Sequence, residues 1–261
     1  MVTAMTLSDR VYIVTGAAGG IGTGITAAVM EQGGRVALVD LDQESVAAAA
    51  AAVDPGGDST LGLRGDVTSE EDAAEAVRYT VDHFGRLDGL VNNAGVVILD
   101  TAWDATPQAW ERELAINVTG TFVMSRAVGR HLRAAGGGAI VNVASNCGKV
   151  GYRNMAGYNA SKAAVINLTR SLALEWASDA INVNAVCPGG VDTPMLAGVA
   201  EWLSPRLEVP ADELLAGMGP AQLGRKVQPI EVGRVVAFLL SDAALIIRGQ
   251  AVNVDGGDTP Y

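Results

Sequence analysis

Tyr158 and Lys162 are spaced so that a phenol and an ammonium group can act on the same proton. They begin and end the run Tyr-Asn-Ala-Ser-Lys, and residues four apart lie on one face of a helix, one turn from each other. Free tyrosine has a pKa of about 10 and is a poor base at neutral pH, but a nearby cation favours the phenolate and lowers that pKa. Such a pair is also common on helix surfaces by chance, so its setting must decide whether it is catalytic.

Ser145 and Asn117 provide part of that setting. Ser145 follows an apolar run, residues 139–144, that is predicted to be a strand, and ligands of doubly wound sheets bind at the carboxyl ends of the strands. Its hydroxyl could hydrogen-bond a substrate oxygen there, although an isolated serine at this place is as readily a turn or helix cap. Asn117 lies within a long amphipathic pattern, where an isolated amide is more often structural than catalytic.

A glycine-rich run, TGAAGGIG at residues 15–22, directly follows the first predicted strand and opens the first helix. Glycines there remove the Cβ atoms that would hold a pyrophosphate away, and the helix N-terminus supplies N–H groups and a positive dipole end. A lone glycine triplet is weak evidence, because an ordinary tight turn has the same composition. The predicted cofactor contacts in this run are Gly16, Gly20, Ile21 and Gly22.

Asp40 makes the glycine run more specific. It ends the second predicted strand, where a carboxylate can hydrogen-bond both hydroxyls of an adenosine ribose and repel a 2′-phosphate. The alternative is that Asp40 caps the next helix, but Asp42 is available for that task. Gly19 and Leu41 do not supply the cation that a 2′-phosphate requires. The sequence therefore predicts NAD rather than NADP, with Asp40 and Leu41 at the cofactor.

Together these residues resemble the short-chain dehydrogenase/reductase family over essentially the whole chain. The motifs that carry the resemblance are TGAAGGIG at 15–22, Asp66-Val67, NNAG at 92–95, Asn117 in AINVTG, Ser145, the run ending at Lys162, Pro188-Gly189 with Thr193, and VDGG at 254–257. A set of motifs in this order and spacing is far more specific than any one of them.

The resemblance implies a role for each catalytic residue. Tyr158 would be the general acid/base, and Ser145 would orient and polarise the substrate oxygen. Lys162 would lower the pKa of Tyr158 and hydrogen-bond the nicotinamide ribose, while Asn117 would hold a water that links Lys162 to solvent. A metal is not required in such a site.

The resemblance also implies the rest of the cofactor site. Asp66 and Val67 would line the adenine, and Asn93 would buttress the strand edge beside the cofactor. Val191 and Thr193 would contact the nicotinamide carboxamide. The remaining expected cofactor contacts are Ala94, Gly95, Pro188 and Gly189.

The elements that would position these residues are short Val-, Ile- and Leu-rich runs that alternate with longer helical patterns. This rhythm predicts an α/β, doubly wound Rossmann-type fold, with one seven-stranded, mostly parallel sheet and helices on both faces. The expected strands are 11–15, 35–40, 61–66, 89–92, 139–144, 181–187 and 250–254, and the expected helices are 20–32, 43–53, 69–84, 107–134, 157–177 and 229–240. No Pro- or Ser-rich linker interrupts residues 1–261, so we expect a single domain.

One stretch does not fit the regular rhythm. Residues 188–228 contain several glycines, a short amphipathic piece around Trp202, and prolines at positions that include Pro205, Pro210 and Pro220. The stretch reads as a long, irregular insertion over one edge of the sheet. Long ordered insertions of this kind are often lids, so we expect a substrate lid here.

Composition excludes several other functions. The chain has 261 residues and a formal net charge of −11, which argues against binding long nucleic acids. Its two cysteines, Cys147 and Cys187, make no disulfide framework and fit a reducing compartment. No apolar stretch approaches the roughly 20 residues that cross a bilayer, and the first ten residues lack the apolar core of a signal peptide. We therefore expect a cytoplasmic protein without a membrane partner.

The expected reaction is reversible hydride transfer between NAD(H) and a secondary alcohol or ketone, which could be a polyol, hydroxyketone, hydroxy acid or cyclic alcohol. The residues expected near the substrate are Val97, Asn146, Cys147, Tyr152, Met195 and Trp202. Lys149, Arg153 and Asn154 could recognise a polyol, hydroxyketone or carboxylate, or could equally be solvated loop residues.

Two other functions fit parts of the pattern. The first is an NADPH-dependent reductase of 3-ketoacyl groups on a carrier, which the absence of cations beside Gly19 and Asp40 disfavours. The second is a nucleotide-binding protein without turnover, which has no need of a poised phenol. The family resemblance further implies a homotetramer packed through the helices expected at 107–134 and 157–177.

Overall fold

All seven predicted strands form one sheet, and every neighbouring pair in it is parallel. The structure, a computed structural model, describes residues 6–259. The strands are β1 Val11–Thr15, β2 Arg35–Asp40, β3 Thr60–Arg64, β4 Gly89–Asn92, β5 Gly138–Val143, β6 Ile181–Pro188 and β7 Ala251–Val254. They lie in the order β3-β2-β1-β4-β5-β6-β7. This order confirms the doubly wound α/β fold, with a sheet that is fully rather than mostly parallel.

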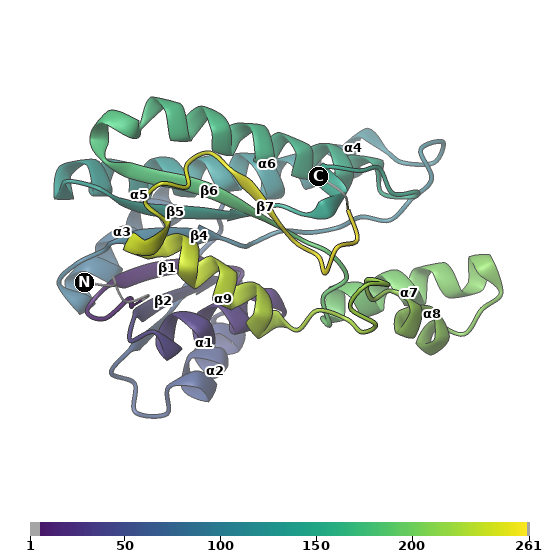
Figure 1. The fold of residues 1–261 in the computed structure, drawn as a ribbon, viewed down its shortest axis with the longest axis horizontal. Helices are drawn as coiled ribbons and strands as arrows, with labels where there is room; N and C mark the ends of the chain where they lie inside the picture. The colour runs from purple at the N-terminus through teal and green to yellow at the C-terminus, as the bar shows by residue number, and fades with distance from the viewer. Residues whose placement is uncertain (1–5, 260–261) are drawn as a thin grey trace.

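Helices cover both faces of the sheet (Figure 1). One layer holds α1 Ile21–Glu31, α2 Gln43–Val53 and α9 Pro229–Leu240, and the other holds α3 Glu70–Phe84, α4 Pro107–Leu114, α5 Thr121–Ala135 and α6 Ala156–Glu175. Alternate residues of β1 serve two separate apolar cores, Val14 in one and Ile13 in the other. This alternation is expected for a strand that is buried on both faces.

The helix expected over residues 107–134 changes form at Asn117. α4 passes into a π-helical turn, η1 Ala115–Gly120, before α5 begins at Thr121. Such turns hold one more residue than an α-helical turn and are frequent at functional sites. The expected catalytic asparagine therefore lies where the backbone departs from regular helix.

The stretch expected to be irregular, residues 188–228, contains two helices, α7 Pro194–Leu207 and α8 Ala211–Gly217. Thr193 caps α7 by accepting a hydrogen bond from the Leu196 N–H at 3.3 Å, and Pro194 occupies the first helical turn, where no intrahelical N–H is needed. The stretch was expected to be an irregular insertion, but Pro205, one of the prolines noted there, lies inside α7. The pair α7 and α8 stands to one side of the main body (Figure 1).

The carboxyl ends of β1 and β4 are the point at which the strand order reverses. β1 pairs with β2 on one side and with β4 on the other. The chain leaves β1 toward α1 in one helical layer and leaves β4 toward α4 in the other (Figure 1). Diverging connections open a crevice at this edge of the sheet, which is where doubly wound folds bind their ligands.

Candidate active site

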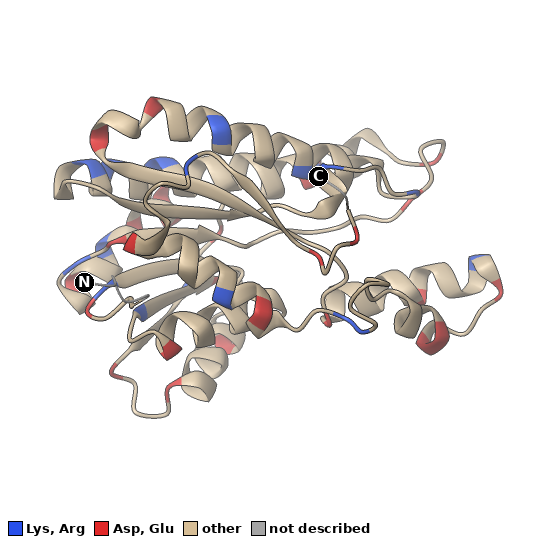
Figure 2. Ribbon diagram, in the orientation of Figure 1, with Lys and Arg blue, Asp and Glu red and all other residues tan. Residues whose placement is uncertain are grey.

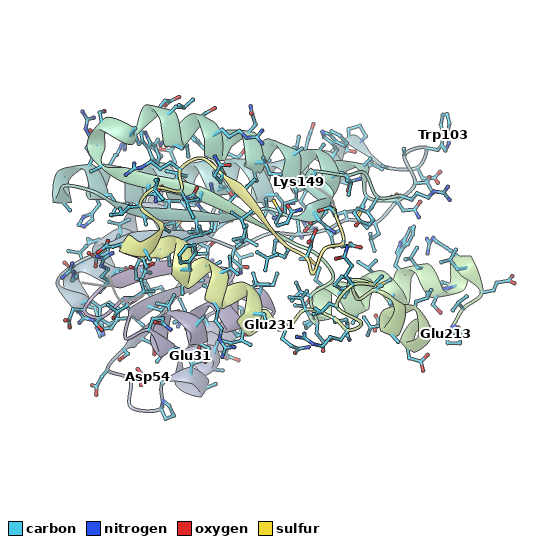
Figure 3. All side chains as sticks on the ribbon, viewed as in Figure 1. Glu31, Asp54, Trp103, Lys149, Glu213 and Glu231 are labelled. Atoms are coloured by element: carbon cyan, nitrogen blue, oxygen red, sulfur yellow. The ribbon has the colours of Figure 1, made fainter. Side chains whose placement is uncertain are left out.

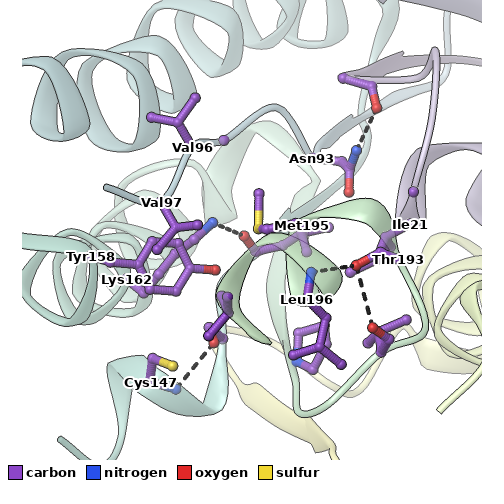
Figure 4. A pocket seen from close by; sticks show the side chains of 18 of the residues that line it. Ile21, Asn93, Val96, Val97, Cys147, Tyr158, Lys162, Thr193, Met195 and Leu196 are labelled. Atoms are coloured by element: carbon purple, nitrogen blue, oxygen red, sulfur yellow. Dashed lines mark hydrogen bonds between the residues drawn. The ribbon is translucent and has the colours of Figure 1, made fainter. Parts of the chain in front are cut away.

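A large cleft lies at that edge of the sheet. Its volume is about 1340 Å³, which exceeds the roughly 300–1,000 Å³ of a pocket for one small ligand, so two molecules can lie in it side by side. Figure 4 shows Tyr158 and Lys162 on one side of the cavity and Thr193, Met195 and Leu196 of the α7 segment facing them. Nearly all of the predicted site residues line this cleft, and the exceptions are Gly22, Asn117 and Trp202.

The glycine run forms the floor at one end. Gly16 has a φ of +61°, and a Cβ there would lie 2.7 Å from the Ala94 Cα, so only glycine lets the first turn approach β4. A Cβ on Gly22 would collide with the Gly16 carbonyl oxygen. Gly22 therefore permits the close packing of the turn against its own backbone and does not line the cleft. Gly16 and Gly20 do line the cleft.

Asp40 lies at the carboxyl end of β2 and holds the glycine run. Its Oδ2 accepts a hydrogen bond from the Ala18 N–H at 2.9 Å, and its Oδ1 accepts one from the Leu41 N–H at 2.8 Å. The next helix is capped by Asp42, which accepts from the Ser45 N–H. The alternative interpretation of Asp40 as a helix cap is therefore wrong, because Asp42 has that position.

Asn93 joins the end of β4 to the glycine run. Its side-chain amide donates to the Thr15 carbonyl at 3.0 Å and to the Gly16 carbonyl at 2.8 Å. The backbone N–H of Asn93 donates in turn to the Thr15 hydroxyl at 3.0 Å. The two strand ends on either side of the crevice are thereby held together, as the expected buttressing role requires.

Asn117 lies behind the cleft wall rather than on it. Its Oδ1 accepts from the Val96 N–H at 2.8 Å, and its Nδ2 donates to the Val96 carbonyl and the Ser161 hydroxyl, each at 2.9 Å. A Cβ on Gly95 would lie 3.2 Å from Asn117 Oδ1 and 3.4 Å from Lys162 Nζ. The side chain therefore fixes the segment after NNAG close to Lys162, and both of its amide hydrogens are already used.

Ser145, Tyr158 and Lys162 come together on one wall of the cleft. The Lys162 ammonium donates to the Val143 carbonyl at 2.9 Å and lies 5.6 Å from the centroid of the Tyr158 ring. Ser145 begins a short 3-10 turn, Asn146–Gly148, and its Oγ accepts from the Cys147 N–H at 3.1 Å. Ser145 is thus both a turn cap and a cleft residue, so the two interpretations of this serine are compatible.

Burial shifts the pKa values of this pair in opposite directions. It raises the pKa of the Tyr158 phenol, which the hydroxyl of Ser145 lowers in part, and it lowers the pKa of Lys162 to about 8. Removal from water favours the neutral form of both groups. The pKa of Tyr158 was expected to be lowered by Lys162, but in this structure burial raises it.

The substrate end of the cleft is mostly apolar. Val97, Cys147 and Met195 line it as predicted. Trp202 does not, because its ring stacks against the Arg206 guanidinium, 3.5 Å from the ring centroid. The cleft instead receives Leu203, the next residue along α7, since one residue of a helix turns its side chain by about 100°.

The two cations near Tyr158 in the sequence have different places. Lys149 donates its ammonium to the Ala251 carbonyl of β7 at 2.8 Å (Figure 3) and is not among the residues that line the cleft. Arg153 lines the cleft, and among residues 6–259 it has no hydrogen bond or ion pair. Of these two cations, Arg153 is thus the one placed to meet a substrate anion.

Sequence reasoning missed two residues near the site. Asp258 joins a network in which the Asn146 amide donates to the Tyr152 hydroxyl at 2.9 Å and to Asp258 Oδ2 at 3.0 Å. No spacing indicates this contact, which depends on β7 lying beside β6. Glu113 is buried, and its Oε1 accepts from the Ile98 N–H at 2.8 Å. The sequence did contain a signal for Glu113. It lies four residues before Asn117, which places the two side chains on the same face of a helix.

Comparisons with known proteins agree with this geometry. A family model described as enoyl-(acyl carrier protein) reductase matches residues 16–259. The chain is 39% identical to 2-(S)-hydroxypropyl-CoM dehydrogenase 3 of Xanthobacter autotrophicus, over 97% of this chain and 98% of that protein. It is 40% identical to cis-4-hydroxycyclohexanecarboxylate dehydrogenase of Sinomonas cyclohexanicum (97% of each chain), and 37% identical to NAD-dependent glycerol dehydrogenase of Listeria innocua (97% and 95%).

Solved structures show the same fold. A crystal structure of actinorhodin polyketide ketoreductase with NADPH superposes with a TM-score of 0.91 at 36% sequence identity, covering 97% of this chain and 98% of that one. The chain belongs to the short-chain dehydrogenase/reductase family. It is therefore an oxidoreductase of the alcohol dehydrogenase type that uses a nicotinamide cofactor.

Proposed function

We propose that this protein interconverts a secondary alcohol and a ketone with NAD(H), and that Tyr158 is the general acid/base. The observation that carries the proposal is the wall formed by Ser145, Tyr158 and Lys162 in a cleft whose other end is the glycine run and Asp40. The relatives named above act on glycerol, cis-4-hydroxycyclohexanecarboxylate and 2-(S)-hydroxypropyl-CoM, as their names state. A polyol, hydroxyketone, hydroxy acid or cyclic alcohol would fit this reaction.

The residues divide the chemistry between them. When bound, the nicotinamide cofactor supplies the carbon that accepts or delivers the hydride. Tyr158 takes the hydroxyl proton as the alcohol becomes a ketone and returns it in the reverse direction. Ser145, whose hydroxyl donates to Asn146 Oδ1 at 3.3 Å, would turn to donate to the substrate oxygen. Lys162 donates one N–H to the Val143 carbonyl, and its other two N–H groups are available to the ribose hydroxyls of the cofactor.

The preference for NAD rests on Asp40. Its carboxylate is held in place by two backbone N–H groups and keeps free lone pairs for the ribose hydroxyls, whereas a 2′-phosphate would meet its negative charge. The alternative function is an NADPH-dependent reductase of 3-ketoacyl groups on a carrier. The similar ketoreductase structure, which contains NADPH, is the observation that favours this alternative. Among the residues lining this end of the cleft, Gly19, Asp40 and Leu41 offer a 2′-phosphate no cation.

We also propose that the chain works as one domain in which residues 188–228 act as the substrate lid. The segment carries α7 and α8, and residues of both helices line the cleft. Thr193 lies against the glycine run, 3.6 Å from where a Gly20 Cβ would be. A bound cofactor would thus touch the base of α7, which links cofactor binding to the position of the lid.

The assembly and location that we propose are a homotetramer in the cytoplasm. Exposed apolar side chains such as Leu174 of α6 support an assembly through that helix. The two cysteines are free thiols, as a reducing compartment favours. Within residues 6–259, no helix has both the length and the apolar character needed to cross a membrane.

The decisive experiment compares the wild-type enzyme with Tyr158→Phe. With NAD and a panel of secondary alcohols, the wild type should form NADH, and the variant should lose about 10²–10⁴-fold in kcat, the usual contribution of general acid–base catalysis. NADH binding, measured by fluorescence, should remain. Near-normal turnover in the variant would refute the role of Tyr158. If the wild type binds NADH but oxidises no alcohol, the result would instead favour the alternative function, a nucleotide-binding protein that catalyses no reaction.

The cofactor preference needs its own comparison. The wild type should have a higher kcat/KM with NAD than with NADP, and Asp40→Ala should reduce that ratio because the repulsion of the 2′-phosphate is lost. Asp42→Ala is the matched control, since Asp42 only caps α2 and its loss should leave the ratio unchanged. A wild type that prefers NADPH would overturn the proposal.

A further inference from the structure

The side of α7 that faces the cleft carries a continuous apolar stripe. Met195, Val199, Leu203 and Leu207 follow each other at intervals of four residues, and all four line the cleft. At a rise of 1.5 Å per residue, the stripe is about 18 Å long. It begins next to Thr193, at the cofactor end, and runs outward along the lid.

This stripe has not been covered by the rest of the chain. The side chain of Met195 is 43% exposed and that of Leu207 is 54% exposed, although both belong to a cavity wall. The lining of the same cleft also includes the apolar side chains of Val96, Val97 and Met155. Large apolar side chains that remain open to water within a cleft mark a binding surface for an apolar ligand.

Three polar side chains at the substrate end, Asn146, Tyr152 and Asp258, are already paired with one another, whereas Arg153 is not. Asn146 donates one amide hydrogen to the Tyr152 hydroxyl and the other to Asp258, and Tyr152 donates its own proton to Asp258 at 3.0 Å. A polyol lying between this network and α7 would have to break the network or leave its spare hydroxyls against the apolar side chains of α7. An unmade hydrogen bond of a buried hydroxyl is costly, so the site disfavours such a substrate.

We propose that the substrate is a secondary alcohol whose carbinol carbon carries an apolar body, either alicyclic or branched aliphatic, that lies along the stripe of α7. This inference rests on the proposed function, because it assumes that Ser145 and Tyr158 hold the carbinol oxygen. It goes further in selecting apolar alcohols over short polyols. The body then occupies the space between Val97 and Leu203.

The first test compares cyclohexanol with glycerol, which are both neutral and both have a secondary carbinol. With NAD, kcat/KM should be at least 100-fold higher for cyclohexanol. Comparable or higher values for glycerol would overturn the inference and leave the proposed function intact. If neither these nor any other alcohol yields NADH while NADH still binds, the proposed function fails and the inference fails with it.

The second test changes the stripe itself. Leu203→Asn should raise KM for cyclohexanol about tenfold with a smaller change in kcat, and should raise the inhibition constant of cyclohexanecarboxamide, which has no carbinol to oxidise, by a similar factor. Arg206→Asn is the matched control, because it puts the same residue in the same helix outside the cleft. Its KM and inhibition constant should match those of the wild type.

A further variant separates the apolar contact from the fold of the lid. Leu203→Met keeps an apolar side chain of similar size and should keep both constants within about twofold of the wild type. Thermal melts of all three variants show whether they fold. An unchanged inhibition constant in a folded Leu203→Asn protein would overturn the inference, as would an equal rise in Arg206→Asn.

Discussion

Glu113 is a buried carboxylate whose position bears on the proton chemistry of Tyr158. It is 3% exposed, and among residues 6–259 no Lys or Arg forms an ion pair with it. A Cβ on Gly157, the residue before Tyr158, would collide with its Oε2. Burial raises the pKa of Glu113, and its negative charge raises the pKa of Tyr158. The chain thus keeps an acid beside the proposed general acid/base, Tyr158, and the charge of this acid opposes the phenolate.

The prediction from this contact concerns the pH profile. In the proposed mechanism Tyr158 accepts a proton during alcohol oxidation, so kcat/KM should rise with pH as the phenol ionises. Glu113→Gln removes the neighbouring charge and should move this rise to lower pH. Glu111→Gln, an exposed change on the same helix, should leave the profile in place. A profile for Glu113→Gln that coincides with the wild type, in a folded protein, would show that the charge does not reach Tyr158.

The buried ammonium group of Lys162 should lower the free energy of unfolding of the protein. Its pKa is lowered from 10.5 to about 8 on folding, so between these pH values the unfolded chain holds a proton that the folded chain lacks. Stability from this group therefore rises with pH through that window, and below about pH 8 a constant penalty remains. A shift of this size corresponds to roughly 3 kcal/mol, and the hydrogen bond to Val143 offsets about 1 kcal/mol.

Lys162→Met should consequently stabilise the protein while abolishing turnover. At pH 7 the free energy of unfolding should increase by about 2 kcal/mol, and the advantage should shrink as the pH approaches 10. Denaturant titrations at the two pH values measure both effects. A variant that is less stable than the wild type at pH 7 would show that the hydrogen bond to Val143 outweighs the cost of burying the ammonium group.

At the scale of elements, α1 and α9 cross at glycines. A Cβ on Gly24 would collide with the backbone of Pro229, and one on Gly233 would collide with the Gly24 carbonyl oxygen. These are backbone atoms at the starts of two helices, and they cannot move aside as the end of a side chain can. The crossing lets α9 pack against the helix that begins at the glycine run, and so fixes the helix whose N-terminus faces the cleft.

Gly24→Ala should therefore destabilise the protein although alanine is the better helix former. We expect a loss of about 3 kcal/mol, at the upper end for overpacking, and a decrease in Tm of roughly 6–12 °C for a chain of this size. Gly198→Ala in α7 is the matched control, since a Cβ there meets nothing within 4 Å and should stabilise the helix by up to about 1 kcal/mol. Equal melting temperatures for the two variants would contradict this account of the crossing.

How far the sequence predicts these elements depends on the range of the interaction that forms them. The strands and most helices follow from local patterns, such as the apolar run of β1 and the capping of α3 by Ser69. The π-helical turn at Asn117 was missed, because it depends on the contacts that Asn117 makes with Val96 and Ser161. The contact of Asp258 with Asn146 joins residues 112 apart in sequence, and no local pattern specifies it.

The candidate site was predicted in the same uneven way. Motifs located the glycine run, Asp40 and Tyr158, because their positions relative to strand ends are fixed by the fold. The lid residues were harder, since one step along a helix decides which side chain enters the cleft. Trp202 was predicted from the short amphipathic piece around it, but Leu203 has the position that continues the apolar stripe of α7.

At the scale of the whole molecule, charge and apolar surface are distributed differently. Figure 2 shows acidic and basic residues interspersed over both helical layers, although the net charge is −11. Two of the most exposed apolar side chains, Leu174 and Ile246, are 80% and 92% exposed. They flank a contact between α6 and the segment before β7, where a Gly249 Cβ would lie 3.3 Å from the Ala173 Cβ. A surface of this kind favours burial against another copy of the chain.

The proposed homotetramer can be tested on this surface. Sedimentation of the wild type at micromolar concentration should give the mass of four chains, and the double variant Leu174→Glu with Ile246→Glu should sediment as a smaller species, because four interfaces cannot bury the added charges without cost. Trp103→Glu is the control: Trp103 is 96% exposed but stands at the tip of a distant loop (Figure 3), so this variant should remain a tetramer. A monomeric wild type would refute the assembly, and a tetrameric double variant would place its interfaces on other surfaces.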